Sequence, residues 1–114
     1  MQRVLRWVFW AAVAFTFVVA TLPRPIHLPG EPSDKVQHIL GFAVLTMLGA
    51  AAYARTSALR IVLGLAAFGA LIEATQAIPA LHRDAELLDW VADVIAVAVV
   101  LLTVRAWQHF TRKA

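Results

Sequence analysis

Cysteine is absent from the chain, and charged residues are scarce. Asp, Glu, Lys and Arg make up 15% of the 114 residues, whereas roughly a quarter is usual in a soluble domain. The lack of cysteine excludes disulfides, cysteine-ligated metals and thiol nucleophiles. The sequence also has no serine in a nucleophile motif, no phosphate-binding glycine loop and no clustered basic patch. We therefore expect no nucleic-acid partner and none of the enzyme classes that depend on these motifs.

Long apolar blocks dominate the chain instead. Hydrophobic residues make up 61% of it and are concentrated at about residues 4–22, 36–54, 58–78 and 87–104. Each block approaches the ~20 residues that an α-helix needs to cross the ~30 Å hydrocarbon core of a membrane. Prolines at positions 23, 25, 29, 32 and 79 fall between the blocks or end them. The sequence predicts an all-α fold, a polytopic membrane four-helix bundle that forms one domain over residues 1–114.

The segments before, between and after these blocks refine the prediction. The first block follows Arg3 and Arg6, so a signal peptide is its alternative. Against that alternative, the apolar run is long and no small-x-small cleavage site stands clearly before Pro23, and we expect a retained helix. Only residues 55–57 separate the second block from the third. This short connection predicts a tight antiparallel hairpin of the two helices.

Basic residues are distributed unevenly between the two ends of the predicted helices. With a cytoplasmic N-terminus, seven of them fall on the inner side and three on the outer side. This distribution obeys the positive-inside rule and predicts that both termini are cytoplasmic. Trp7 and Trp107 fit an aromatic belt at the inner interface, and Trp90 fits one at the outer interface. The inner basic residues are Arg3, Arg6, Arg55, Arg60, Arg105, Arg112 and Lys113, and the outer ones are Arg24, Lys35 and Arg83.

All seven acidic residues fall at the predicted outer end. Ionisable groups within membrane spans are costly and usually face the bundle interior, and residues three or four apart share one helix face. We therefore predict a polar cluster that serves either as a ligand site or as a staple between helices. The cluster consists of Asp34, Lys35, His38, Glu73, Gln76, Arg83, Asp89 and Asp93.

The balance of charge within this cluster favours a ligand site over a staple. Its acidic residues outnumber its two cations, Lys35 and Arg83. We predict that one of these cations forms an ion pair with Asp89, Asp93 or Glu73. The outer-loop residues His27 and His82 are interpreted as solvated, and Phe42, one turn after His38, as a packing residue.

A metal site is a weaker alternative. His38 together with Asp89, Asp93 and Glu73 offers groups that bind divalent metals. No ligand pair at short spacing, such as HExxH, is present. The prediction therefore includes no metal and no cofactor.

Two strings of residues resemble the motifs of VanZ-like membrane proteins. The residues DKVQH at 34–38, followed by Phe42 and Leu45, resemble the family's D-K-x-x-H-x-x-x-F-x-x-L opening. The residues EATQ at 73–76, then Arg83, Asp89 and Asp93, resemble its E-x-x-Q and R-x(5)-D-x-x-x-[N/D] patterns. Glycines that are common later in the fourth helix are replaced by Ala96 and Val100, which puts close packing of that helix in doubt.

The resemblance implies a small protein of the bacterial cytoplasmic (inner) membrane, in a family named after a member linked to teicoplanin resistance, and supplies no reaction. The favoured function is binding of an envelope ligand, such as a lipid head group, a lipid-linked wall precursor or a glycopeptide. The alternatives are an intramembrane enzyme that uses His38 and a carboxylate as acid and base, a small transporter, and a purely structural protein. A transporter needs polar groups through the cytoplasmic half, where the sequence offers Thr16, Thr46 and Thr103.

Overall fold

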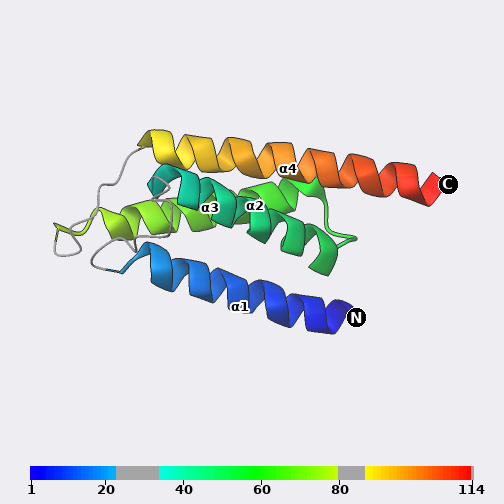
Figure 1. Cartoon of the computed structure of the whole chain (residues 1–114), viewed down its shortest axis with the longest axis horizontal. Coiled ribbons are helices and arrows are strands. Elements are labelled where there is room, and N and C mark those ends of the chain that lie inside the picture. Colours follow the sequence, from blue (N-terminus) through cyan, green and yellow to red (C-terminus); the bar gives the residue numbers. More distant parts are fainter. Residues whose placement is uncertain (23–33, 80–86, 114) are drawn as a thin grey trace.

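The computed structural model describes residues 1–22, 34–79 and 87–113, and within them it contains four α-helices. They are α1 (Gln2–Ala20), α2 (Asp34–Ala52), α3 (Ala58–Gln76) and α4 (Leu87–Lys113). Successive helices run in opposite directions, so both chain termini and the connection between α2 and α3 lie at one end of the bundle (Figure 1). The predicted all-α fold of four helices is confirmed for these residues.

The observed helix limits follow local chemistry. Ser57 caps α3, because its hydroxyl accepts a hydrogen bond from the backbone N–H of Arg60 at 3.3 Å. Helix α4 continues nine residues past the predicted end at Val104, so that prediction was wrong at its C-terminal limit. No proline or glycine occurs between Leu87 and Lys113. The helix therefore continues beyond the apolar block, and in Figure 1 it projects past the other helices.

Helix α2 occupies the centre of the packing. It contacts α1 and α4 extensively, whereas α2 and α3 contact each other only sparingly despite their short connection. Helix α3 packs mainly against α4, so α4 contacts both α2 and α3. The shared core is apolar and closely packed, and its largest fully buried hydrophobic side chains are Phe42, Leu45, Ile72, Val97 and Leu101.

Two glycines allow neighbouring helices to approach closely. A Cβ atom at Gly49 would lie 3.2 Å from the Phe9 ring, and one at Gly69 would lie 3.2 Å from Trp90 and 3.3 Å from Phe42. By contrast, a Cβ atom at Gly64 would meet no atom within 4 Å. The glycines at 49 and 69 therefore have a packing role, and Gly64 lies on an open surface.

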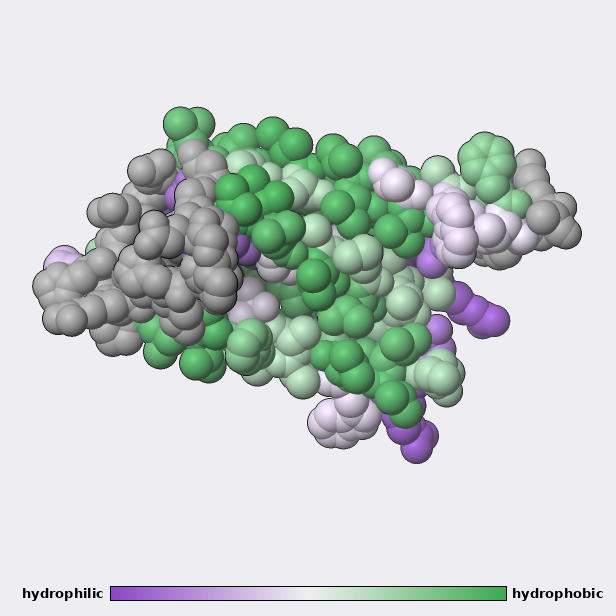
Figure 2. Space-filling view, viewed as in Figure 1, coloured by the Kyte–Doolittle hydropathy of each residue, from purple (hydrophilic) through white to green (hydrophobic). Residues whose placement is uncertain are grey.

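Much of the lateral surface of the bundle is apolar. Figure 2 shows hydrophobic side chains along the length of the helices and polar ones towards the ends. Phe15 is 70% exposed, and Leu63, Val99 and Leu102 are also largely exposed. Within the described residues, α1, α3 and α4 are long and apolar enough to cross a membrane, and α2 contributes a shorter apolar stretch, Val36–Ala52. Such a surface is typical of a protein whose helices face lipid.

Candidate functional site

Side chains from three helices meet at the end of the bundle opposite the chain termini. His38 lies in the second turn of α2, Glu73 in the last turn of α3 and Asp93 in the second turn of α4. One nitrogen or oxygen atom from each of these side chains lies within 4.8 Å of the others. His38 and Asp93 are buried and Glu73 is half-buried. Three residues that are distant in the sequence thus converge as the predicted polar cluster requires.

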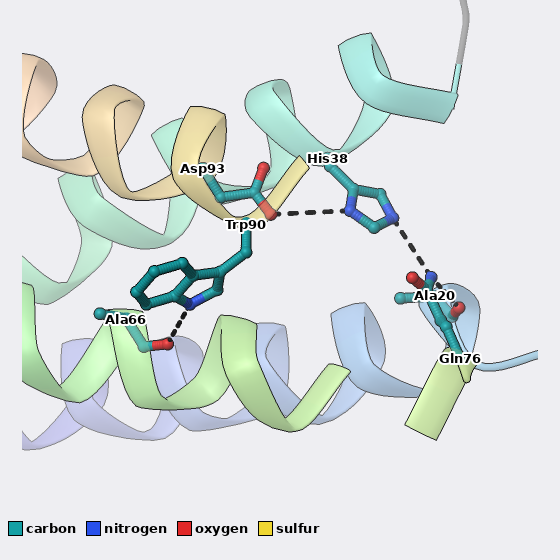
Figure 3. Close-up of polar contacts among 6 residues, drawn as sticks. All are labelled: Ala20, His38, Ala66, Gln76, Trp90 and Asp93. Carbon is teal, nitrogen blue, oxygen red and sulfur yellow. Dashed lines mark hydrogen bonds and ion pairs between the residues drawn. The ribbon is translucent and has the colours of Figure 1, made fainter. Parts of the chain in front are cut away.

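The contact between His38 and Asp93 joins α2 to α4. The Nδ1 atom of His38 lies 3.6 Å from the Oδ2 atom of Asp93 (Figure 3). This distance permits an ionic interaction but exceeds the usual range of an N–H···O hydrogen bond, about 2.7–3.2 Å. The space between the two groups is therefore wider than a direct hydrogen bond needs.

Gln76 connects His38 to the first helix. Its Nε2 atom donates a hydrogen bond to the backbone carbonyl of Ala20 at 2.7 Å and lies 3.4 Å from His38 Nε2 (Figure 3). Ala20 is the last residue of α1, so the amide satisfies a carbonyl at a helix end that has no partner within its own helix. Gln76 has a structural role in holding α1, and it also lies against the imidazole of His38.

Two oxygen atoms of the polar cluster are buried without a hydrogen-bond partner among the described residues. They are Oε1 of Gln76, whose residue is 1% exposed, and Oδ1 of Asp93, whose residue is 3% exposed. Native proteins rarely bury a polar atom without a partner, because desolvation then goes uncompensated. These two oxygens are therefore available to an additional group.

Asp89 is buried in the first turn of α4, one turn before Asp93. The positive end of the helix dipole stabilises a carboxylate in this position. Asp89 does not belong to the group of three whose ligating atoms lie within 4.8 Å of one another. The two aspartates therefore differ in role. Asp93 faces His38, whereas the position of Asp89 in the first turn of α4 is enough to explain a carboxylate there.

The rest of the predicted cluster lies outside the described residues. Arg83 falls in the segment 80–86, and the side chains of Asp34 and Lys35 are likewise not described. The ion pair predicted for Arg83 or Lys35 stays a prediction, and His27 and His82 also fall outside. Phe42 is buried in the core, which confirms its predicted packing role.

Trp90, predicted to lie in the outer aromatic belt, makes a contact between two helices, and its place relative to a membrane stays a prediction. Its side chain is half-buried, and its indole N–H donates a hydrogen bond to the carbonyl of Ala66 at 2.9 Å (Figure 3). A buried indole needs a hydrogen-bond acceptor, and the absence of a side chain at Gly69 gives the ring room against α3. Trp90 therefore joins α3 to α4 near the polar cluster. Trp7 and Trp107 are exposed, as residues of an interfacial belt would be.

The opposite end of the bundle carries a second set of polar contacts, and we call it the arginine end. Arg6 Nε donates to the carbonyl of Ala52 at 3.2 Å, and Arg105 donates to the carbonyls of Ala54 at 2.7 Å and Thr56 at 3.0 Å. The Arg6 guanidinium also lies 4.7 Å from the centre of the Tyr53 ring. These arginines satisfy carbonyls at and just beyond the C-terminus of α2.

The sequence did not predict that Arg6 and Arg105 donate to the carbonyls at the end of α2. In the sequence analysis these two residues served only to assign the membrane side. A signal was present: α2 has no basic residue in its last turn, so its terminal carbonyls need donors from elsewhere. Which arginines supply them depends on how α1 and α4 pack, and local sequence does not encode that arrangement.

No protein-family model matches the chain, and no curated protein or solved structure is significantly similar to it. The resemblance to VanZ-like proteins therefore depends on the two sequence motifs alone. The functional argument has to start from the geometry of the polar cluster.

Proposed function

We propose that the chain is an integral protein of the bacterial cytoplasmic membrane, and that its polar cluster faces outward and binds a ligand of the cell envelope. A lipid head group and a lipid-linked wall precursor are the ligand classes that fit such a position. The proposal includes the VanZ-like character inferred from the motifs, with glycopeptide sensitivity as the corresponding phenotype.

The observation that carries the proposal is the convergence of His38, Glu73 and Asp93 from three helices within 4.8 Å. Polar side chains inside an apolar bundle are costly, and those that persist commonly mark a functional site. The buried oxygens of Asp93 and Gln76 that have no hydrogen-bond partner among the described residues support a site that is completed by another group. A polar cluster that served only to join helices would not be stabilised by buried oxygens that lack a hydrogen-bond partner.

The membrane location is supported by the three long apolar helices and by the apolar lateral surface. The proposed orientation adds the excess of basic residues at the end that carries both termini. Reporter fusions test it: fusions after Arg55 and at the C-terminus should report the cytoplasm, and a fusion near Gly30 should report the periplasm. A periplasmic C-terminus would contradict the proposed orientation.

Acid–base catalysis on a lipid-linked substrate is the second candidate. The contact between His38 and Asp93 at 3.6 Å favours it, because a carboxylate beside an imidazole can orient the ring and stabilise its charged form. Transport receives less support. The hydroxyls of Thr46 and Thr103 donate to the carbonyls of Phe42 and Val99 within their own helices, so they are not presented to a polar path.

The test of ligand binding uses Glu73→Gln in cells that depend on the protein for envelope integrity. Glutamine preserves the size of the side chain and most of its hydrogen bonding while removing the negative charge. We expect this variant to lose the phenotype, measured as sensitivity to glycopeptides or detergents at matched protein levels. Melting of the purified protein should stay close to that of the wild type.

A destabilised variant with an intact polar cluster supplies the control. Arg105→Met removes hydrogen bonds at the arginine end and should lower stability without touching His38, Glu73 or Asp93. If the cluster is only a staple, both variants should lose function in proportion to their loss of stability. Wild-type sensitivity from both Glu73→Gln and His38→Ala would overturn the proposed function.

A further inference from the structure

The three converging side chains of the polar cluster have the chemistry of a metal-binding set. An imidazole and two carboxylates bind divalent metals through one atom each, and such atoms of His38, Glu73 and Asp93 lie within 4.8 Å of one another. Ligands of a tetrahedral zinc ion, at ~2.0–2.2 Å from the metal, lie roughly 3.4 Å apart. The separation of 3.6 Å between His38 Nδ1 and Asp93 Oδ2 is close to that value.

Asp93 supplies a second and independent observation. Its residue is 3% exposed, and its Oδ1 atom has no hydrogen-bond partner among the described residues. Buried carboxylates in proteins are paired, hydrogen-bonded or bound to a metal. The distance from Asp93 Oδ2 to His38 Nδ1 exceeds the hydrogen-bond range. A cation between the two groups would compensate the carboxylate more fully than this contact does.

We infer that His38, Glu73 and Asp93 bind one divalent metal ion of the zinc class. The imidazole favours zinc and similar transition metals over calcium and magnesium, which prefer all-oxygen ligands. Three protein ligands leave a coordination position for water or for an oxygen of a bound molecule. This inference rests on the proposed function for its biological role, since that position would receive the phosphate of an envelope ligand, but the metal site is testable by itself.

The contacts of Gln76 specify how the imidazole must change when it binds the ion. The amide N–H groups of Gln76 lie towards the carbonyl of Ala20 and towards His38 Nε2. If the Gln76 amide donates to both groups, Nε2 of His38 is the acceptor and the ring proton is on Nδ1. Coordination through Nδ1 requires that proton to move to Nε2, where it needs an acceptor. The Oε1 atom of Gln76, which has no partner among the described residues, is an acceptor of the right chemistry if the amide turns over.

Zinc binding to the full-length protein in detergent tests the inference directly. The protein is purified through a tag without histidine and titrated with zinc by calorimetry, with calcium as the comparison ion. We expect one zinc ion per chain. Asp93→Asn should weaken its binding by at least about tenfold, and His109→Ala should leave it unchanged. His109 is the matched control, because it is an exposed histidine at the far end of α4.

A second measurement decides the matter even if Asp93→Asn does not fold. His38 is the only remaining histidine of the four when His27, His82 and His109 are replaced by alanine. X-ray absorption of this variant with one equivalent of zinc should show one imidazole in the coordination shell. Absence of that imidazole, or zinc binding of equal affinity in the wild type and a folded Asp93→Asn variant, would overturn the inference.

The outcomes also separate the metal site from the proposed function. If the wild-type protein does not bind zinc but Glu73→Gln still changes envelope sensitivity, the metal site is refuted and envelope-ligand binding stands. If the protein binds zinc specifically but Glu73→Gln cells behave like the wild type, the metal site stands and the proposed function is refuted.

Discussion

The two ends of the bundle accommodate their polar groups in different ways. At the arginine end, Arg6 and Arg105 donate to carbonyls at the end of α2, and the Trp10 indole donates to the Tyr53 hydroxyl at 2.8 Å. These contacts join donors to acceptors around the connection between α2 and α3, although the Nε atom of Arg105 is itself buried without a partner among the described residues. At the other end, three side chains that bind ions or protons converge, and buried oxygens remain without partners among the described residues.

This difference separates a structural set of polar contacts from a candidate site. Helix ends always need donors or acceptors, so the contacts of the arginine end have a sufficient explanation in the fold. No helix end requires an imidazole and two carboxylates from three different helices to meet. Residues of a functional site are often not the best choice for stability. The polar cluster fits that description better than the arginine end does.

Arg83→Ala tests whether the polar cluster also depends on a cation, and its expected effect on stability is the largest. If Arg83 pairs with one of the cluster's carboxylates, its removal leaves that charge buried and alone, which costs about 3–5 kcal/mol. Thermal melting in detergent should therefore drop sharply. Neutralising the matching acid as well should restore part of the loss, whereas a melting curve like that of the wild type would contradict the predicted ion pair.

Arg105→Met tests the structural role assigned to the arginine end. The substitution keeps much of the apolar stem of the side chain and removes its hydrogen bonds to the carbonyls of Ala54 and Thr56. Hydrogen bonds that involve a charged group contribute about 1.5–3 kcal/mol each in favourable settings, and the exposure of this region brings the expected loss to the lower part of that range. Denaturation in a mixed detergent measures it. An unchanged stability would mean that the arginine end does not hold α2 and α4 together.

Gly69 and Gly64 allow a comparison between a packed and an open position on α3, and its expected effects on stability are the smallest. Gly69→Ala should destabilise the protein by about 1–3 kcal/mol, because the new methyl group would meet Trp90, which its hydrogen bond to Ala66 holds in place. Gly64→Ala should instead be neutral or stabilise α3 by up to about 1 kcal/mol, since alanine favours the helix. Equal effects of the two substitutions would contradict the observed packing.

Much of the fold was predictable because long apolar helices are encoded locally. Four apolar blocks and the prolines between them located every helix to within about two residues at most limits. The end of α4 was the exception, because the sequence after Val104 is polar but contains nothing that stops a helix. Local patterns also missed that α2 and α3 pack against α4 more than against each other, although the short connection predicted a tight hairpin.

Some members of the site were predictable from the sequence, and their contacts less so. Depth along the helices and charge pointed to His38, Glu73, Gln76 and Asp93, which the structure brings to one end of the bundle. The pairing of His38 with Asp93 and of Gln76 with Ala20 depends on the rotation of each helix about its axis. Alternation of polar and apolar residues defines that rotation only weakly when nearly every face is apolar.

The ligand itself offers the most direct test of the proposed site. Native mass spectrometry of the protein released from membranes should show a bound lipid or lipid-linked molecule on the wild type. The adduct should be absent from Glu73→Gln and retained by Arg105→Met, because only the first variant changes the polar cluster. A wild-type spectrum without an adduct, or the same adduct on Glu73→Gln, would contradict the assignment of the polar cluster as a ligand site.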